Sequence, residues 1–172
     1  MIEIRPERAE DHAAIYEVNK RAFNQEDEAQ LIERIRTSPH FIPVLPFVAV
    51  KAGKIVGHIL FSSIIIKTPT NSVSALLLAP MAVLPEFQRQ GIGSLLIKKG
   101  LEECRCLGHE IVVVIGHPEY YPRFGFSSAR AKKLHILFKV PDEAFLVLEL
   151  IPGVLDNVRG VVEFPSPFDG MM

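Results

Sequence analysis

The sequence predicts a single α/β domain in which a mixed, mostly antiparallel sheet is flanked by helices. Three features predict this fold class: apolar residues at helical spacing over 8–36, strand-like segments joined by short turns over 47–83, and a strand–helix–strand succession after them. A chain of 172 residues can bury a core and falls within the size range of one domain. We therefore expect one domain over 1–172, with a core over about 1–130 and further strands over about 131–172.

The first part of the chain is predicted to form an edge strand and two helices. Residues 2–5 alternate between apolar and charged side chains, which indicates a short strand. Apolar residues over 8–23 repeat at helical spacing, and those over 31–35 do the same. The second helix is expected to end before Pro39, because the residue that precedes a proline disfavours helical backbone.

A meander of three strands is predicted next. The segments 47–50, 55–66 and 73–83 are rich in apolar and β-branched residues, and turn-forming residues separate them at 52–53 and 68–71. Such short connections join neighbouring strands that run antiparallel. The three segments should therefore lie side by side in an antiparallel sheet.

A crossover unit is predicted to follow the meander. Apolar and charged residues over 94–107 have helical spacing, and the continuous apolar run 111–115 is typical of a strand covered on both faces. A helix between two strands predicts that the strands pair in parallel. In the tail, the segments 134–140, 145–151 and 161–164 are predicted to be strands.

Charge and targeting features argue against several classes of function. The net charge of −1 provides no broad basic surface for nucleic acid or membranes, and no signal segment or membrane-length apolar run is present. Cys104 and Cys106 should point to different sides of one helix, so we expect no disulfide between them. The scattered histidines match no zinc-binding spacing, so no metal is expected. These features predict a cytoplasmic protein.

The sharpest functional signal is the segment from Val83 to Ser94, which follows a strand and opens a helix. Gly91 and Gly93 allow a tight turn and a close approach of the backbone to a ligand. The first N–H groups of a helix have no internal acceptor, and the helix dipole favours an anion there. The loop that ends at Ser94 therefore suits a pyrophosphate.

Three ligands compete for this loop. A P-loop requires Gly-Lys-Ser/Thr, whereas Gly93 is followed by Ser94 and Leu95, and a dinucleotide fingerprint requires a third glycine where this chain has Leu96. Coenzyme A needs backbone amides for its pyrophosphate but no metal-binding hydroxyl, and it fits better than either. The alternative without a ligand is a turn that needs its glycines for geometry alone.

Two motifs resemble those of a known family. Gln88-Arg89-Gln90-Gly91-Ile92-Gly93 resembles the Gln/Arg-x-x-Gly-x-Gly/Ala signature of the GNAT superfamily of N-acetyltransferases. Tyr120-Tyr121-Pro122-Arg123-Phe124-Gly125-Phe126 resembles the Tyr-x-x-x-Gly-Phe segment of the same superfamily. The order of elements over 2–126 resembles the whole GNAT core, which is about three quarters of the chain, and the remainder is similar to a bacterial branch of the superfamily.

The resemblance implies that acetyl-CoA is the co-substrate and that a splayed cleft in the sheet holds it. In similar enzymes, the strand before the loop diverges from its neighbour, and the pantetheine arm pairs with the exposed backbone. Carried over position by position, the implied cofactor-binding residues are Met81, Ala82 and Val83 for the pantetheine arm, Gln88, Arg89, Gln90, Gly91, Ile92, Gly93 and Ser94 for the pyrophosphate, and Phe124 for packing. Core packing alone is the alternative for Phe124.

The resemblance also implies catalytic residues for acetyl transfer to a primary amine. Tyr121 matches the tyrosine that serves as the acid for the departing thiolate, while Tyr120 is expected to point elsewhere. A backbone N–H near Ala82 or Val83 would stabilise the oxyanion. His117, just after the strand 111–115, and Glu28 on the second helix are candidate bases, and a proton relay through water is the alternative.

Two other functions remain open at this point. A non-catalytic acyl-CoA-binding regulatory module would keep the loop but lack turnover, and a nucleotide-binding protein would use the loop for magnesium-bound ATP or GTP. For the enzyme, the acceptor is expected to be an amine on a small molecule or on a protein. The apolar C-terminal strands allow a homodimer.

Overall fold

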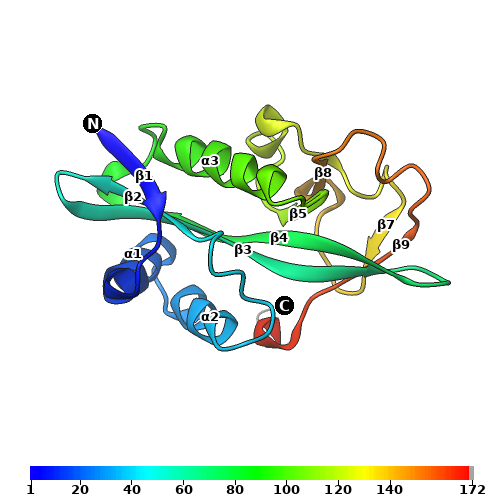
Figure 1. The fold of residues 1–172 in the computed structure, drawn as a ribbon, viewed down its shortest axis with the longest axis horizontal. Helices are drawn as coiled ribbons and strands as arrows, with labels where there is room; N and C mark the ends of the chain where they lie inside the picture. The colour runs from blue at the N-terminus through cyan, green and yellow to red at the C-terminus, as the bar shows by residue number, and fades with distance from the viewer. Residues whose placement is uncertain (171–172) are drawn as a thin grey trace.

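The computed structural model of the protein describes residues 1–170. One sheet forms the centre of the molecule, with α3 on one face and α1 and α2 on the other (Figure 1). The helices are α1 (His12–Phe23), α2 (Asp27–Arg36) and α3 (Ile92–Cys106). The strands are β1 (Ile2–Pro6), β2 (Phe47–Lys51), β3 (Lys54–Lys67), β4 (Ser72–Val83), β5 (Ile111–Ile115), β6 (Ser127–Ser128), β7 (Leu134–Ile136), β8 (Phe145–Glu149) and β9 (Gly160–Glu163). This arrangement confirms the predicted fold class.

The strand order is β1-β2-β3-β4-β5-β8-β6, and β9 pairs with both β3 and β7. The parallel pairs are β4 with β5 and β7 with β9, while the other pairs are antiparallel. The β2–β3 turn has positive φ angles at Ala52 and Gly53, as a tight hairpin turn requires. In the β3–β4 turn, the N–H of Thr68 donates to the carbonyl of Asn71 at 2.8 Å. Both predicted turns are therefore confirmed.

Several predicted elements have different bounds in the structure, among them the strand expected over 145–151, which ends at Glu149. The helix expected from residue 8 begins with a 3-10 turn, Ala9–Asp11, because the Asp11 carboxylate accepts hydrogen bonds from the N–H of Arg8 at 2.8 Å and from Arg5 at 2.7 Å. The helix expected from Ser94 begins at Ile92, since Gly91 (φ 83°) turns the chain into it. The strand expected over 134–140 ends at Ile136, and the next residues leave the sheet.

Two apolar cores hold the helices against the sheet. Between the sheet and α3, Phe61 packs with Leu96 and Leu101, and a Cβ added at Gly100 would overlap the Phe61 ring. Between the sheet and the other two helices, Ile15 and Ile32 pack with buried residues of β3 and β5. Both faces of the central strands are thus covered, which explains the continuous apolar run of β5.

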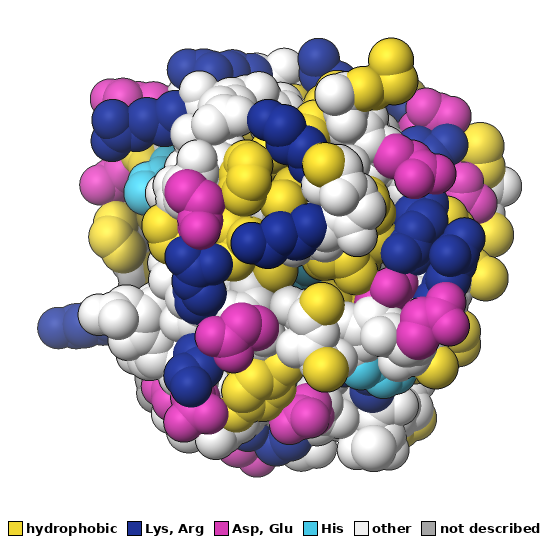
Figure 2. Space-filling model, turned by 90° about the vertical axis from the view of Figure 1, so that its left-hand side faces the viewer, with side chains coloured by type: hydrophobic (Ala, Val, Ile, Leu, Met, Phe, Trp, Pro, Cys, Tyr) yellow, Lys and Arg dark blue, Asp and Glu magenta, His cyan; other side chains and the backbone are white. Residues whose placement is uncertain are grey.

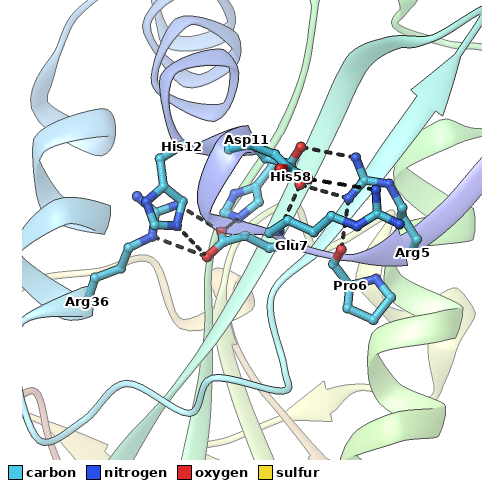
Figure 3. A network of polar contacts seen from close by, with 9 residues as sticks. Arg5, Pro6, Glu7, Asp11, His12, Arg36 and His58 are labelled. Atoms are coloured by element: carbon cyan, nitrogen blue, oxygen red, sulfur yellow. Dashed lines mark hydrogen bonds and ion pairs between the residues drawn. The ribbon is translucent and has the colours of Figure 1, made fainter.

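A buried polar cluster anchors α1 and α2 to the sheet (Figure 3). The carboxylate of Glu7 accepts hydrogen bonds from Arg36 of α2 at 2.8 Å and from His58 of β3 at 3.0 Å, and His12 of α1 lies 3.3 Å away. Burial alone would raise the pKa of Glu7, but the bonds from His58 and Arg36 lower it to about 2. Glu7 therefore remains ionised and joins three elements at one point.

One face of the molecule carries both signs of charge side by side (Figure 2). On the face at the left of Figure 1, Lys and Arg side chains lie among Asp, Glu and apolar groups (Figure 2). This face therefore offers no extended basic area of the kind that binds nucleic acid. Within residues 1–170, no helix combines the length and apolar character needed to cross a membrane.

Candidate active site

The site begins where β4 and β5 separate. These parallel strands pair at Leu76 with Val112 and at Leu77 with Val113, and the pairing ends there although β4 continues to Val83. Opposite this stretch, the register of β3 shifts between Ile59 and Phe61, which accommodates a proline in β4 at a bulge. The far half of β4 is therefore splayed from β5, as predicted.

Every second residue of this part of β4 points its backbone N–H and C=O groups into the gap. The N–H of Leu84 donates to the carbonyl of Val56 at 2.8 Å, and Ala82 pairs with His58 in the same register. Because N–H and C=O groups point to opposite edges at successive residues of a strand, Met81 and Val83 direct theirs toward the gap. Ala82 directs its backbone toward β3, and its side chain is buried.

The loop between β4 and α3 is held in place by its own side chains. The Gln88 amide donates to the carbonyl of Val83 at 3.0 Å, and the Gln90 amide donates to the carbonyl of Glu86 at 3.3 Å. Glu86 also forms an ion pair with Arg21 of α1 at 2.8 Å. The loop thus reaches the start of α3 in a fixed conformation.

A cavity of about 570 Å³, which we call the loop cavity, opens beside the start of α3. The first helical amides belong to Ile92, Gly93 and Ser94, and the helix ladder starts where the N–H of Leu95 donates to Gly91 at 3.1 Å. The residues that line this cavity are Val83, Phe87, Gln88, Arg89, Gly91, Ile92, Gly93, Ser94, His117, Tyr120 and Arg123. Unpaired amides and two arginines together suit a phosphorylated ligand.

A second cavity of about 820 Å³, which we call the cleft cavity, lies on the other side of the gap. Its walls come from α1, α2, β4, the end of β5 and the C-terminal segment, and most of them are apolar. The residues that line it are Phe23, Glu28, Leu31, Leu77, Leu78, Ala79, Pro80, Met81, Ile115, Gly116, His117, Tyr121, Phe138, Lys139, Val140, Phe164 and Phe168. This cavity can hold a second, largely apolar molecule.

The two cavities meet at His117, which lines both. Tyr120 and Tyr121 lie beside this junction with their rings 5.3 Å apart and nearly perpendicular. Tyr120 faces the loop cavity, where its hydroxyl lies 3.0 Å from the hydroxyl of Ser94. Tyr121 faces the cleft cavity, so the two tyrosines serve different sides of the junction.

Tyr121 is held tightly and is protonated at neutral pH. Its side chain packs against Gly116, where an added Cβ would overlap the ring, and against Phe126 at 5.7 Å between ring centres. Burial raises the pKa of Tyr121 to about 12, with a smaller contribution from Tyr120. A neutral hydroxyl in this position can donate a hydrogen bond into the cavity.

The structure brings most of the predicted site residues together. The acid candidate Tyr121, the base candidates His117 and Glu28, and Met81 line the cleft cavity, while the glycine loop lines the other one. Three predicted residues line neither cavity. They are Ala82, whose backbone faces β3, Gln90, which is bonded within the loop, and Phe124, which packs edge to face on Tyr120.

Several lining residues were not predicted. Arg123 follows the tyrosine pair in the motif, and its guanidinium lies 5.6 Å from the Tyr120 ring centre. Its place in the Tyr-x-x-x-Gly-Phe segment was the available signal, and the structure puts it in a 3-10 turn (Tyr121–Phe124) next to the loop cavity. The phenylalanines 138, 164 and 168 carried no such signal, because tertiary contacts alone bring them to the cleft cavity.

Several known proteins resemble this chain in sequence and in fold. The family model described as "Acetyltransferase (GNAT) domain" matches residues 3–129. The protein named "Uncharacterized N-acetyltransferase YjhQ" of Escherichia coli (strain K12) is 39% identical over 134 residues, which are 77% of this chain and 74% of YjhQ. The crystal structure of Escherichia coli YhbS in complex with CoA has a TM-score of 0.88 and 29% identity, covering 97% of this chain and 91% of YhbS.

A second solved structure is similar over nearly the whole length of both chains. It is a GNAT family acetyltransferase from Brucella melitensis in complex with acetyl-CoA, with a TM-score of 0.80 and 30% identity, covering 98% of this chain and 99% of that one. The family match, which spans most of the chain, and the two motifs at the splayed strands lead to the same conclusion. The chain belongs to the GNAT family of N-acetyltransferases.

Proposed function

We propose that this enzyme transfers an acetyl group from acetyl-CoA to a primary amine, and that the two substrates occupy the two cavities. The observation that carries the proposal is the junction at His117, where a cavity suited to phosphates meets an apolar one between the splayed strands. The CoA and acetyl-CoA bound to the two similar enzymes support the choice of co-substrate.

In this proposal the loop cavity holds the coenzyme. The amides of Ile92, Gly93 and Ser94 donate to the pyrophosphate, and Arg89 and Arg123 supply charge-assisted contacts from the rim. Along the splayed part of β4, the outward backbone groups of Met81 and Val83 pair with the amide-containing arm. The thioester then reaches the junction next to Tyr121.

The amine attacks from the cleft cavity. Its nitrogen forms a bond to the thioester carbonyl carbon, the C–S bond breaks, and the amine loses one proton. An N–H of Met81 or Val83 stabilises the oxyanion, since both point into the gap. Glu28 or His117 accepts the amine proton, either directly or through water, because both line this cavity.

Tyr121 acts on the leaving sulfur. Its hydroxyl is neutral at the pH of the cell, because its pKa is raised to about 12, so it can donate to a thiolate. A free thiol has a pKa of about 8.5, so complete proton transfer from Tyr121 is uphill and stabilisation by the hydrogen bond is its main contribution.

Calorimetric titration with acetyl-CoA tests the coenzyme site. Gly91→Val places a side chain in the loop, and Gly53→Val in the β2–β3 turn is its matched control. Both glycines have positive φ (83° and 76°), and an added Cβ would meet no atom within 4 Å at either, so the backbone cost is similar. We expect acetyl-CoA binding in the Gly53 variant and its loss in the Gly91 variant.

Two controls separate this function from its alternatives. ATP with magnesium should not bind; if it binds and acetyl-CoA does not, the loop is a nucleotide site and the proposal fails. Free-thiol release with a panel of amines then separates the enzyme from a binding module. Tight acetyl-CoA binding without thiol release for any amine would identify the module instead.

A further inference from the structure

Three phenylalanines form a continuous wall in the cleft cavity. The ring centre of Phe164 lies 5.2 Å from that of Phe138 and 5.4 Å from that of Phe168, and both contacts are edge to face. All three line the cavity, and Phe168 is buried. We call this set the aromatic wall. Aromatic rings of a ligand pack favourably against such edges and faces.

The wall is fixed by the C-terminal segment that carries it. Strands β7 and β9 pair in parallel, so their C-terminal ends lie side by side. Phe138 follows the end of β7, and Phe164 follows the end of β9. The guanidinium of Arg34 on α2 donates to the carbonyl of Pro167 at 3.0 Å. This hydrogen bond fixes the segment next to Phe168 against α2. The position of the aromatic wall in the cavity is therefore fixed by strand pairing and by a hydrogen bond to α2.

Few charges face the cavity within the described part of the chain. Its ionic side chains are Glu28 and Lys139, with His117 at the junction. Glu28 is half-buried and accepts hydrogen bonds from the neutral amide of Gln25 at 2.9 and 3.2 Å. One carboxylate can receive one ammonium group, but a ligand with several would leave positive charges buried without partners.

We propose that the acceptor is a small primary amine carried on an aromatic or similarly bulky apolar body, with no second positive charge. The inference rests on the proposed function and specifies its substrate class. The apolar body lies against the aromatic wall, and the amine is directed toward Glu28 and the junction at His117. Polyamines and aminoglycosides fit this lining poorly because they carry several ammonium groups, and a protein lysine does so because its amine is not attached to a bulky apolar body.

Binding and turnover with matched amines test the inference. The probes are 2-phenylethylamine, ethylamine and spermidine, titrated by calorimetry into the enzyme saturated with CoA and then assayed with acetyl-CoA. We expect 2-phenylethylamine to bind roughly 30-fold more tightly than ethylamine, as burial of a phenyl group predicts, and kcat/KM to follow the same order.

The variant Phe138→Ala removes the outer ring of the wall, and Phe138→Leu is the control that preserves volume. Phe138 is half-buried, and we expect both variants to remain folded and to bind acetyl-CoA with unchanged affinity. Phe138→Ala should reduce kcat/KM for 2-phenylethylamine roughly tenfold more than it reduces kcat/KM for ethylamine. Phe138→Leu should retain most of the preference.

The possible outcomes separate the inference from the proposed function. If 2-phenylethylamine binds selectively but no amine is acetylated, the proposed function fails and the selectivity of the cavity stands. If spermidine or a lysine peptide is acetylated in preference, the inference is overturned while the acetyltransferase stands. If Phe138→Ala weakens the binding of hexanoyl-CoA and leaves the binding of 2-phenylethylamine unchanged, the aromatic wall holds an acyl chain. The inference is then also overturned.

Discussion

The imidazole Nε2 of His58 lies 3.0 Å from the carboxylate of Glu7. This contact joins β3 to the segment between β1 and α1. His58 is fully buried, and the Glu7 side chain is 5% exposed. Burial lowers the pKa of His58, against the opposing effect of Glu7, so His58 is neutral and donates its Nε2–H. This pair and Arg36 fix the helices that contribute one side of the cleft cavity.

Replacement of Glu7 should therefore destabilise the fold. Glu7→Gln removes the charge that faces Arg36, whose side chain is 12% exposed, and a buried cation left without its partner typically costs about 3–5 kcal/mol. Urea unfolding should show a loss of this size. Glu10→Gln is the control, since Glu10 is exposed and its contact with Arg8 is 3.9 Å long. Similar stability of the two variants would contradict the anchoring role of Glu7.

Stability should also fall with acidification, in two stages. The folded-state pKa of His58 is lowered from 6.5, so the neutral form contributes stability that is lost as the pH falls below about 6.5. The folded-state pKa of Glu7 is about 2 instead of 4.5, so its contribution is present above 4.5 and disappears as the pH falls toward 2.

Urea midpoints measured from pH 7 to pH 3 test this dependence. We expect a decrease that begins near pH 6.5 and steepens below 4.5, and a shallower decrease for Glu7→Gln below 4.5. Equal slopes in the two proteins would show that Glu7 does not carry the acid sensitivity.

The two neighbouring tyrosines should differ in their effect on catalysis. Tyr121 lines the cleft cavity, and Tyr121→Phe removes the hydroxyl that we propose donates to the leaving thiolate. Loss of one such charge-stabilising donor typically reduces kcat about 10²–10³-fold. We expect kcat to fall by that factor with acetyl-CoA affinity unchanged. Tyr120→Phe removes the hydroxyl bonded to Ser94 and should reduce kcat less than about tenfold. The reverse ranking would assign the acid role to Tyr120.

Local sequence features predicted the elements that local interactions determine. Gly53 suits the positive φ of its turn, although Ala52 (φ 50°) does not, and Thr68 and Asn71 hydrogen-bond within the turn at 68–71. The meander and its direction followed from these turns. The glycine loop was predicted for the same reason, because Gly91 has a positive φ that other residues rarely adopt. Much of the lining of the loop cavity could thus be inferred from one continuous segment.

The other half depends on contacts between distant segments. Glu7, Arg36 and His58 lie on three elements, and no spacing in the chain indicates that they meet. The aromatic wall likewise depends on the pairing of β7 with β9 and on the contact of the C-terminal segment with α2. The predicted strand over 134–140 was too long because Phe138 and Val140 line the cleft cavity instead of pairing in the sheet, while Leu137 is exposed.

Gly116 should be essential for catalysis because it makes room for Tyr121. A Cβ at Gly116 would overlap the Tyr121 ring, and a Cβ at Gly100 would overlap the Phe61 ring in the core under α3. Both Gly116→Ala and Gly100→Ala overpack the protein, which typically costs about 1–3 kcal/mol, partly offset at Gly100 by the helix preference of alanine. Only the first substitution moves a ring of the active site.

We therefore expect both alanine variants to melt at lower temperature than the parent, but only Gly116→Ala to lose turnover at a temperature where both are folded. The loss should approach that of Tyr121→Phe, with acetyl-CoA binding retained, because the loop cavity does not include Gly116. Combining Gly116→Ala with Tyr121→Phe should then reduce kcat little further, since each removes the same hydroxyl from its position. Multiplicative losses in the double variant would mean that Gly116 supports catalysis by another route.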